Sequence, residues 1–216
     1  FLTQSPTRLG RVRLAAPSLA NFMGTDQFGR DIFSRCVVAA RVSLLVGFST
    51  VSIALLVGVP LGAIAGFRSP GASDGVIMRF MDVLMAFPPI ILAIAVVAAL
   101  GTQDIEFGPI TIPHIAKVML VIGLLNAPKV ARIVRSAVLV ERNEQYVLAE
   151  RSIGTSETRI VFAHILRNCV SPVAVYATLL VASTILAEAA LSFLGLGIQP
   201  PAPSRGGMLS DSRTYV

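Results

Sequence analysis

Long apolar stretches alternate with polar segments along this chain. The first covers residues 42–67, and its roughly 25 residues extend about 37 Å as a helix, enough to cross the ~30 Å hydrocarbon core of a bilayer. Residues 80–101 and 170–193 form similar stretches, and residues 115–125 form the core of another. The pattern predicts about four membrane-spanning helices joined by short loops.

The first stretch carries a glycine repeat. Gly58, Gly62 and Gly66 recur at every fourth position, so a helix would place them on one face, where another helix can approach closely. Pro60 lies in the same stretch and is expected to bend the helix. We interpret the repeat as a helix-packing surface.

Two features mark a pathway through the predicted bundle. Pro88 and Pro89 interrupt the second stretch, and they must kink or break its helix. Because freed backbone groups are tolerated at membrane depth only beside protein or a wet cavity, we expect this helix to line a pathway. Glu188 lies well inside the last stretch, where a charge costs ~2.5–3.5 kcal/mol. It either bonds to another membrane subunit or lines a gate near the outer mouth.

Composition agrees with a membrane protein. The 216 residues are 54% hydrophobic and 14% charged, whereas water-soluble domains usually carry about 25% charged residues. The net charge of +6 does not indicate nucleic acid binding, because no Lys/Arg run is interleaved with aromatic residues and Trp is absent. Excess arginine is typical of cytoplasmic loops and lipid headgroup contacts.

The distribution of charge predicts the orientation in the membrane. Residues 129–167 contain seven Lys/Arg, and residues 102–113 contain none, so the former are expected in the cytoplasm and the latter outside. Residues 1–41 are then an extracytoplasmic lead-in, although they are rich in arginine. Lys117 lies close enough to the end of its span to snorkel toward the surface.

The most informative segment is the polar interval at residues 146–168. Gly154 can take a positive φ and turn the chain, and Ser156 is a good N-cap for a helix that begins at Glu157. At 100° per residue this helix has one apolar arc, made of Val161, Phe162, Ile165 and Leu166. From spacing alone it is either an amphipathic connector on the lipid surface or a site on which another protein packs.

Four motifs carry a resemblance to a known family. They are the segment at residues 146–168, GTDQFGRDIFSR at 24–35, RVSLLVG at 41–47 and ILAEAALSFLGLGIQPP at 185–201. Together they resemble permease subunits of binding-protein-dependent ABC importers, closest to the C-type permease of the dipeptide/oligopeptide branch. The chain departs from the family in having Leu148-Ala149-Glu150 where Glu-Ala-Ala is usual, and Arg167 where Pro is usual.

The resemblance implies a fold and an assembly. The fold would be an all-α polytopic type I ABC importer-like transmembrane domain over residues 42–216, with a cytoplasmic coupling loop at residues 141–169. About four spans would lie in this segment and six in the full subunit. The implied partners are a second permease subunit in a heterodimer, two ATPase subunits, an extracytoplasmic solute-binding protein and the lipid bilayer of a prokaryotic cytoplasmic (inner) membrane.

The resemblance also implies roles for single residues. We expect the ATPase-coupling residues to be Glu150, Gly154, Glu157, Arg159, Val161, Phe162 and Ile165. The candidates for the pathway or gate are Pro88, Pro89 and Glu188. Gly154 would act as a hinge-like turn, and the apolar arc would be the side of a lever that the ATPase moves.

The sequence contains no motif for chemistry of its own. It has no P-loop, so ATP and Mg are expected to be bound by the partner ATPase subunits, and no metal-binding or catalytic motif is present. We therefore expect a non-catalytic subunit of a peptide importer. Nickel chelates or haem are alternative cargoes. An ion-coupled secondary transporter and a structural membrane anchor are alternatives from other classes.

Overall fold

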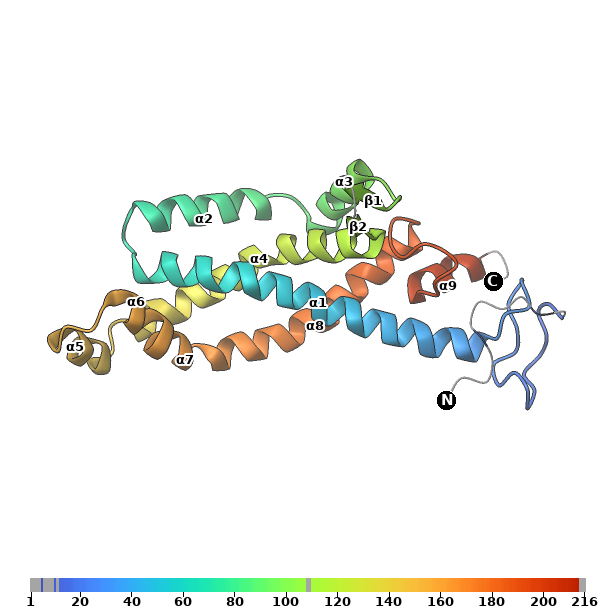
Figure 1. The fold of residues 1–216 in the computed structure, drawn as a ribbon, viewed down its shortest axis with the longest axis horizontal. Helices are drawn as coiled ribbons and strands as arrows, with labels where there is room; N and C mark the ends of the chain where they lie inside the picture. The colour runs from blue at the N-terminus through green and yellow to red at the C-terminus, as the bar shows by residue number, and fades with distance from the viewer. Residues whose placement is uncertain (1–4, 6–9, 11, 108–109, 214–216) are drawn as a thin grey trace. The chain divides into compact units, whose positions relative to one another are not determined.

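The computed structural model describes residues 5, 10, 12–107 and 110–213. They are mostly helical and divide into two compact units. The first unit comprises residues 1–48, 94–119 and 184–216, and the second comprises residues 49–93 and 120–183. In chain order the elements (Figure 1) are α1 (Ile32–Phe67), α2 (Ala72–Met85), α3 (Pro89–Leu100), β1 (Ile105–Phe107), β2 (Ile110–Ile112), α4 (His114–Glu141), α5 (Gln145–Ser152), α6 (Glu157–Arg159), the π-helix η1 (Ile160–Ile165), α7 (Leu166–Asn168), α8 (Val170–Phe193) and α9 (Arg205–Ser212).

The described helices include candidate membrane spans. α1 and α8 are long and apolar enough to cross a bilayer, and α2 with α3 make a third candidate if this bent pair counts as one span. α8 coincides with the predicted stretch at residues 170–193, whereas α1 begins at Ile32, ten residues before the predicted start. α4 contains the predicted stretch at residues 115–125 but is not among these candidates.

The predicted break at the proline pair is confirmed. α2 ends at Met85, α3 begins at Pro89, and the two helices are bent by 85°. Pro89 occupies the first helical position, where a missing N–H costs nothing. The polar residues between the first two apolar stretches, 68–79, are expected to form a loop, but α2 already begins at Ala72. Asp74 lies in its first turn, where a carboxylate complements the helix dipole.

The glycine repeat packs against α4 within the second unit. A Cβ added to Gly58 would lie 2.7 Å from the carbonyl oxygen of Ala127, and one added to Gly66 would lie 2.8 Å from that of Arg135. A Cβ added to Gly62 would likewise clash with the carbonyl oxygen of Ala131. The backbones of α1 and α4 therefore touch along three successive turns, which confirms the predicted packing role.

Ion pairs join α2 to α4 in the same unit. The Arg135 guanidinium binds the Asp74 carboxylate through two nitrogens, each at 2.6 Å. Arg132 Nη2 lies 2.5 Å from Asp82 Oδ1. Bidentate geometry is the strongest arrangement for such a pair. These contacts explain why α4 carries arginines along one side.

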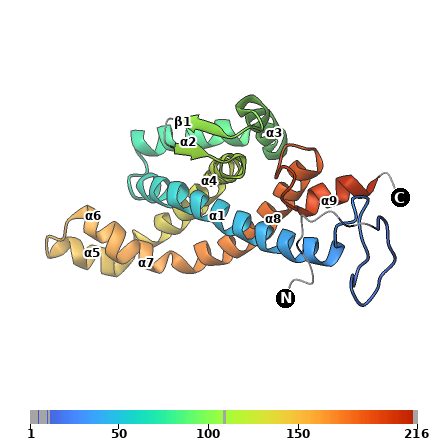
Figure 2. The same ribbon diagram turned by 45° about the vertical axis from the view of Figure 1, so that its right-hand side comes forward.

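Lys117 has a different role from the one predicted. Its ammonium group donates to the carbonyl oxygens of Leu100 at 3.2 Å, Gly101 at 2.7 Å and Gln103 at 2.7 Å. Lys117 is 6% exposed, so it caps the C-terminal end of α3 instead of snorkelling. The last carbonyls of a helix have no partner within the helix and attract a cation. The predicted acidic loop that follows contains the antiparallel pair β1–β2, seen as two arrows in Figure 2.

Candidate functional site

Gly154 forms the turn that the sequence predicts. Its φ is +81°, in the left-handed region that favours glycine. The Gly154 N–H donates to Arg151 O at 3.0 Å, and the Thr155 N–H donates to Glu150 O at 3.0 Å. This pair of bonds is a Schellman motif, which satisfies the last carbonyls of α5 and reverses the chain. The turn is confirmed.

The helix after the turn is not a single α-helix. α6 begins at Glu157 as predicted, and Ser156 is at its N-cap position, but the Ser156 side chain makes no capping bond. The next six residues form the π-helix η1, and α7 continues from Leu166. A π-helix has i→i+5 hydrogen bonds and so about one more residue per turn than an α-helix. The arcs predicted at 100° per residue are therefore rotated.

The apolar side chains of this segment differ in exposure. Val161 is 6% exposed and Ile165 is fully buried, and both belong to the core of the second unit with Val147 and Ile160. Phe162 points outward and is 60% exposed. Val161 and Ile165 of the predicted apolar arc therefore pack on the core, and Phe162 is the member of the arc that is exposed. The coupling roles of all three residues stay predictions.

Two of the three polar candidates are held by contacts within the loop. Glu150 Oε2 accepts a hydrogen bond from Thr155 Oγ1 at 2.6 Å, and its Oε1 lies 3.6 Å from His164 Nε2. Glu157 receives the Arg151 guanidinium at 3.1 and 3.3 Å. Arg159 is exposed and has no ion pair among the described residues. Thus Glu150 and Glu157 stiffen the turn from both sides.

Glu141, which sequence reasoning missed, closes the base of the loop. Its Oε2 accepts from Tyr146 Oη at 2.8 Å and from Asn168 Nδ2 at 3.1 Å, which joins the end of α4 to α5 and α7. Burial, and then the bond to Glu141, raise the pKa of Tyr146 to about 12. The phenol therefore remains a donor at neutral pH. No local spacing predicts contacts across 27 residues.

Arginines attach the loop to the end of α1. Arg142 Nη1 donates to the carbonyl oxygens of Gly66 at 3.0 Å and Phe67 at 3.3 Å, and also to that of Ser69. The Arg151 guanidinium lies 5.5 Å from the centroid of the Phe67 ring, a cation–π distance. The elements α5, α6 and α7, grouped between α4 and α8 in Figure 1, therefore form a braced extension of the second unit.

The loop also exposes two apolar side chains that the helical pattern did not single out. Ile153, directly before the Gly154 turn, is 78% exposed, and Leu148 on α5 is 56% exposed. With Phe162 they are the exposed large apolar side chains among the described residues of this loop. Since apolar area in water costs roughly 25 cal/mol per Å², these side chains are candidates for contact with a partner. The sequence feature that could have identified Ile153 as an exposed residue is its position directly before the turn glycine.

Glu188 lies in the first unit and is fully buried. Ser192 Oγ donates to its Oε1 at 2.5 Å, and the same Oγ accepts from the Ile198 N–H at 3.0 Å. Glu188 Oε2 has no hydrogen-bond partner among the described residues. The described contacts thus tie the loop after α8 back onto that helix. The pathway or gate roles of Glu188, Pro88 and Pro89 stay predictions.

The comparisons with known proteins agree with these features. Residues 58–216 match the family described as binding-protein-dependent transport system inner membrane component. The dipeptide transport system permease protein DppC of Alkalihalophilus pseudofirmus is 45% identical over 94% of this chain. The di/tripeptide permease protein DppC of Pseudomonas aeruginosa is 43% identical over 90%, and the glutathione permease protein GsiD of Pectobacterium atrosepticum is 40% identical over 92%.

The chain covers only part of these relatives. The matched regions are 63%, 60% and 62% of their respective lengths. The match nevertheless extends through the spans, the polar loop and the segment after α8. Both the family match and the level of identity confirm the resemblance inferred from the four motifs. This chain belongs to the permease family of inner-membrane components of binding-protein-dependent transport systems.

Proposed function

We propose that this chain is part of the permease subunit of an ATP-driven importer of dipeptides or oligopeptides. The support is that relatives at 39–45% identity are named as dipeptide, di/tripeptide or D,D-dipeptide transport permeases. A solute-binding protein delivers the cargo outside the membrane. This subunit and a second permease subunit each form half of the pathway. Separate ATPase subunits bind ATP and Mg.

The loop at residues 141–169 is the proposed docking site for an ATPase subunit. The observation that carries this proposal is the 60% exposure of Phe162, although Val161 and Ile165 of the same arc are buried. A large aromatic side chain that fills a partner's pocket is a typical interface hot spot. Ile153 and Leu148 are additional apolar contacts, and Arg159 is the free charge that fits an acidic rim.

The loop is suited to transmit motion because it is braced. Glu141, Arg142 and Arg151 hold it on α1 and α4, and the Schellman bonds fix the turn. When the ATPase dimer closes, a displacement of Phe162 is passed to the helix ends as a rigid-body movement. The spans then change between inward-open and outward-open arrangements that differ in their contacts with the ATPase.

The test compares two phenylalanines of equal exposure. Phe162→Ala removes the proposed anchor, and Phe80→Ala on α2 is its matched control, because both side chains are 60% exposed. The full subunit is reconstituted with its second permease, ATPases and binding protein in proteoliposomes. Loss of a hot spot, at 2 kcal/mol or more, weakens ATPase binding by about 30-fold. We expect Phe162→Ala to lose ATPase binding and dipeptide uptake and Phe80→Ala to retain ATPase binding. Wild-type ATPase affinity in Phe162→Ala refutes the assignment.

A further inference from the structure

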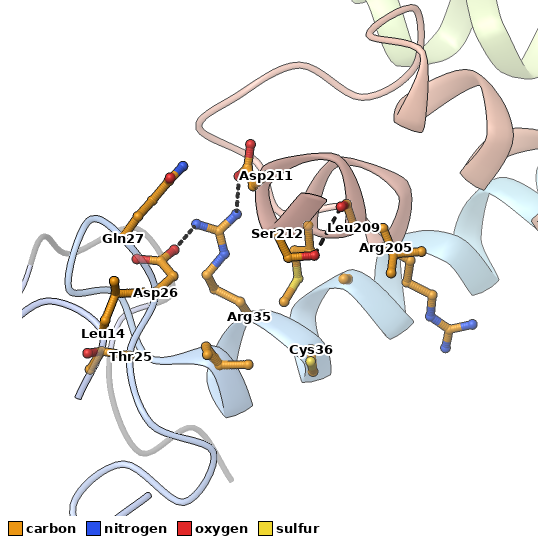
Figure 3. Close-up of a pocket in the computed structure, with 13 residues that line it drawn as sticks. Leu14, Thr25, Asp26, Gln27, Arg35, Cys36, Arg205, Leu209, Asp211 and Ser212 are labelled. Atoms are coloured by element: carbon orange, nitrogen blue, oxygen red, sulfur yellow. Dashed lines mark hydrogen bonds and ion pairs between the residues drawn. The ribbon is translucent and has the colours of Figure 1, made fainter. Parts of the chain in front are cut away.

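A cavity of about 610 Å³ lies in the first unit, among the N-terminal segment, the first turns of α1 and α9 (Figure 3). This volume is within the ~300–1,000 Å³ range of small-molecule sites. Its walls are mainly apolar, with contributions from Leu14, Ile32, Met208 and Leu209. Charged side chains gather at one end, where Arg35 lies between the carboxylates of Asp26 and Asp211 in Figure 3.

The two acids at this end are bound very differently. Asp26 Oδ2 lies 2.7 Å from Arg30 Nε and 2.8 Å from Arg35 Nη1, both hydrogen-bond distances. Asp211 Oδ2 lies 3.6 Å from Arg30 Nη2 and 3.9 Å from Arg35 Nη2, too far for hydrogen bonds. The side chain of Asp211 is 49% exposed. Asp31, also close in sequence, accepts from the Ser34 N–H at 2.9 Å and so caps α1.

The two arginines are therefore held closely by one carboxylate and loosely by the other. Their side chains are only 11% and 6% exposed, yet they share one tightly bound carboxylate. Arg30 Nη2 and Arg35 Nε are buried and have no hydrogen-bond partner in the part of the chain that the structure describes. Buried guanidinium groups are normally paired with carboxylates in close, often bidentate, geometry. Arg35 lines the cavity, and its Nη2 lies 3.9 Å from the loosely held Asp211 carboxylate, so a ligand carboxylate that displaces Asp211 gains a close guanidinium contact.

We propose that this cavity binds a small amphipathic carboxylate. Its carboxylate takes the loosely held position of Asp211 next to Arg35, and its apolar part lies among Leu14, Ile32, Met208 and Leu209. A peptide with an apolar C-terminal residue has this chemistry, and so does a fatty acid. The site itself goes beyond the proposed transport function. Only the choice of the peptide as ligand rests on that function.

A native cysteine reports occupancy. Cys36 lines the cavity and is partly exposed, whereas Cys169 is 1% exposed. The full complex in nanodiscs is treated with a maleimide, and alkylation of Cys36 is followed by mass spectrometry of the peptide that contains it. The probes are alanyl-phenylalanine, its C-terminal amide as the matched control that lacks the carboxylate, and decanoate.

We expect alanyl-phenylalanine to slow alkylation of Cys36 and the amide to have no effect. Protection by decanoate alone supports the site but overturns the choice of a peptide. Equal protection by the acid and the amide, or protection by none of the probes, overturns the proposal. Uptake and ATP hydrolysis are not readouts, so a failure of the proposed transport function does not decide this test.

Asp211→Asn should strengthen ligand binding, whereas a purely structural role of Asp211 predicts that its replacement weakens binding. Because the Asp211 carboxylate competes with the ligand for the arginines, its removal lowers the concentration for half-protection by about tenfold. Asp211 is half exposed on α9, so its replacement by Asn leaves no buried group without a partner at that position. Met208→Trp, which fills the apolar part, abolishes protection. Half-protection that is unchanged or weaker in Asp211→Asn contradicts the proposal.

Discussion

The turn at Gly154 gives the most quantitative prediction. At φ +81° a residue other than glycine costs ~1–2 kcal/mol, and Asn costs less than Ala because it enters the left-handed region more readily. A Cβ at this position meets nothing within 4 Å, so the cost of Ala or Asn is one of backbone conformation alone. Pro in addition fixes φ near −65° and removes the N–H that bonds to Arg151 O, worth ~0.5–1.5 kcal/mol.

These terms rank the variants. Gly154→Pro excludes the observed turn, because the proline ring cannot reach φ +81°. Ala disfavours the turn by ~1–2 kcal/mol, which lowers its population roughly 5- to 30-fold, and Asn disfavours it less. The buried loop residues Val147 and Ile160 do not touch Gly154, so the complex should still assemble. We expect the ratio of peptide taken up to ATP hydrolysed to fall in the order Gly, Asn, Ala, Pro.

The assay measures both rates in the same proteoliposomes that contain the full complex. Subunit stoichiometry in the purified complex is the control for assembly, and Gly154→Asn is the control for the loss of glycine itself. A Gly154→Pro complex with wild-type stoichiometry and a wild-type ratio of uptake to hydrolysis would show that the turn does not transmit force. That result would refute the lever.

Three further predictions concern stability. Gly62→Ala pushes a Cβ into the backbone of α4 and should destabilise the fold by about 1–3 kcal/mol. Gly75→Ala on α2 is the control, because a Cβ there meets nothing within 4 Å, and it should be neutral or stabilising. Both effects are measured by the temperature at which the buried Cys169 thiol becomes reactive in a Cys36→Ser background. Lys117→Met should lower the unfolding temperature although Met is more apolar than Lys, because three carbonyls at the end of α3 lose their donor. A raised unfolding temperature would instead favour a lysine that snorkels to the surface. Burial raises the pKa of Asp26. Hydrogen bonds from the Arg30 and Phe28 N–H groups and from the Arg30 side chain lower it by a larger amount, so the pKa lies below its ordinary value of 3.8. This stabilisation is complete above that value and is lost as the pH falls through the lowered pKa; calorimetry should show a steeper acid loss for wild type than for Asp26→Asn.

Much of the fold could be predicted from local sequence signals. α8 follows from a continuous apolar run, the break before α3 from Pro88 and Pro89, and the turn from a glycine between polar helical segments. These features depend on the properties of adjacent residues. The family could be predicted for the same reason, since its motifs are short and contiguous.

The remaining features depend on contacts between distant residues. Lys117 caps α3 because the chain brings carbonyls 14 to 17 residues away onto it. Glu141 closes the loop through Asn168, 27 residues away. Phe162 is exposed and Val161 is buried because only one side of the broad apolar arc packs on the core of the second unit. The spacing of apolar and polar residues does not predict the Lys117 cap, the Glu141–Asn168 contact or the separate exposure of Phe162.

Photo-crosslinking at position 162 tests the central claim most directly. Benzoyl-phenylalanine replaces Phe162 in the full subunit in intact cells, and the same probe replaces the equally exposed Phe80 as the control. The account predicts that the probe at position 162 forms an adduct with a nucleotide-hydrolysing subunit and that the probe at position 80 does not. Adducts at position 162 with lipid or with an extracytoplasmic protein, and none with an ATPase, would contradict it.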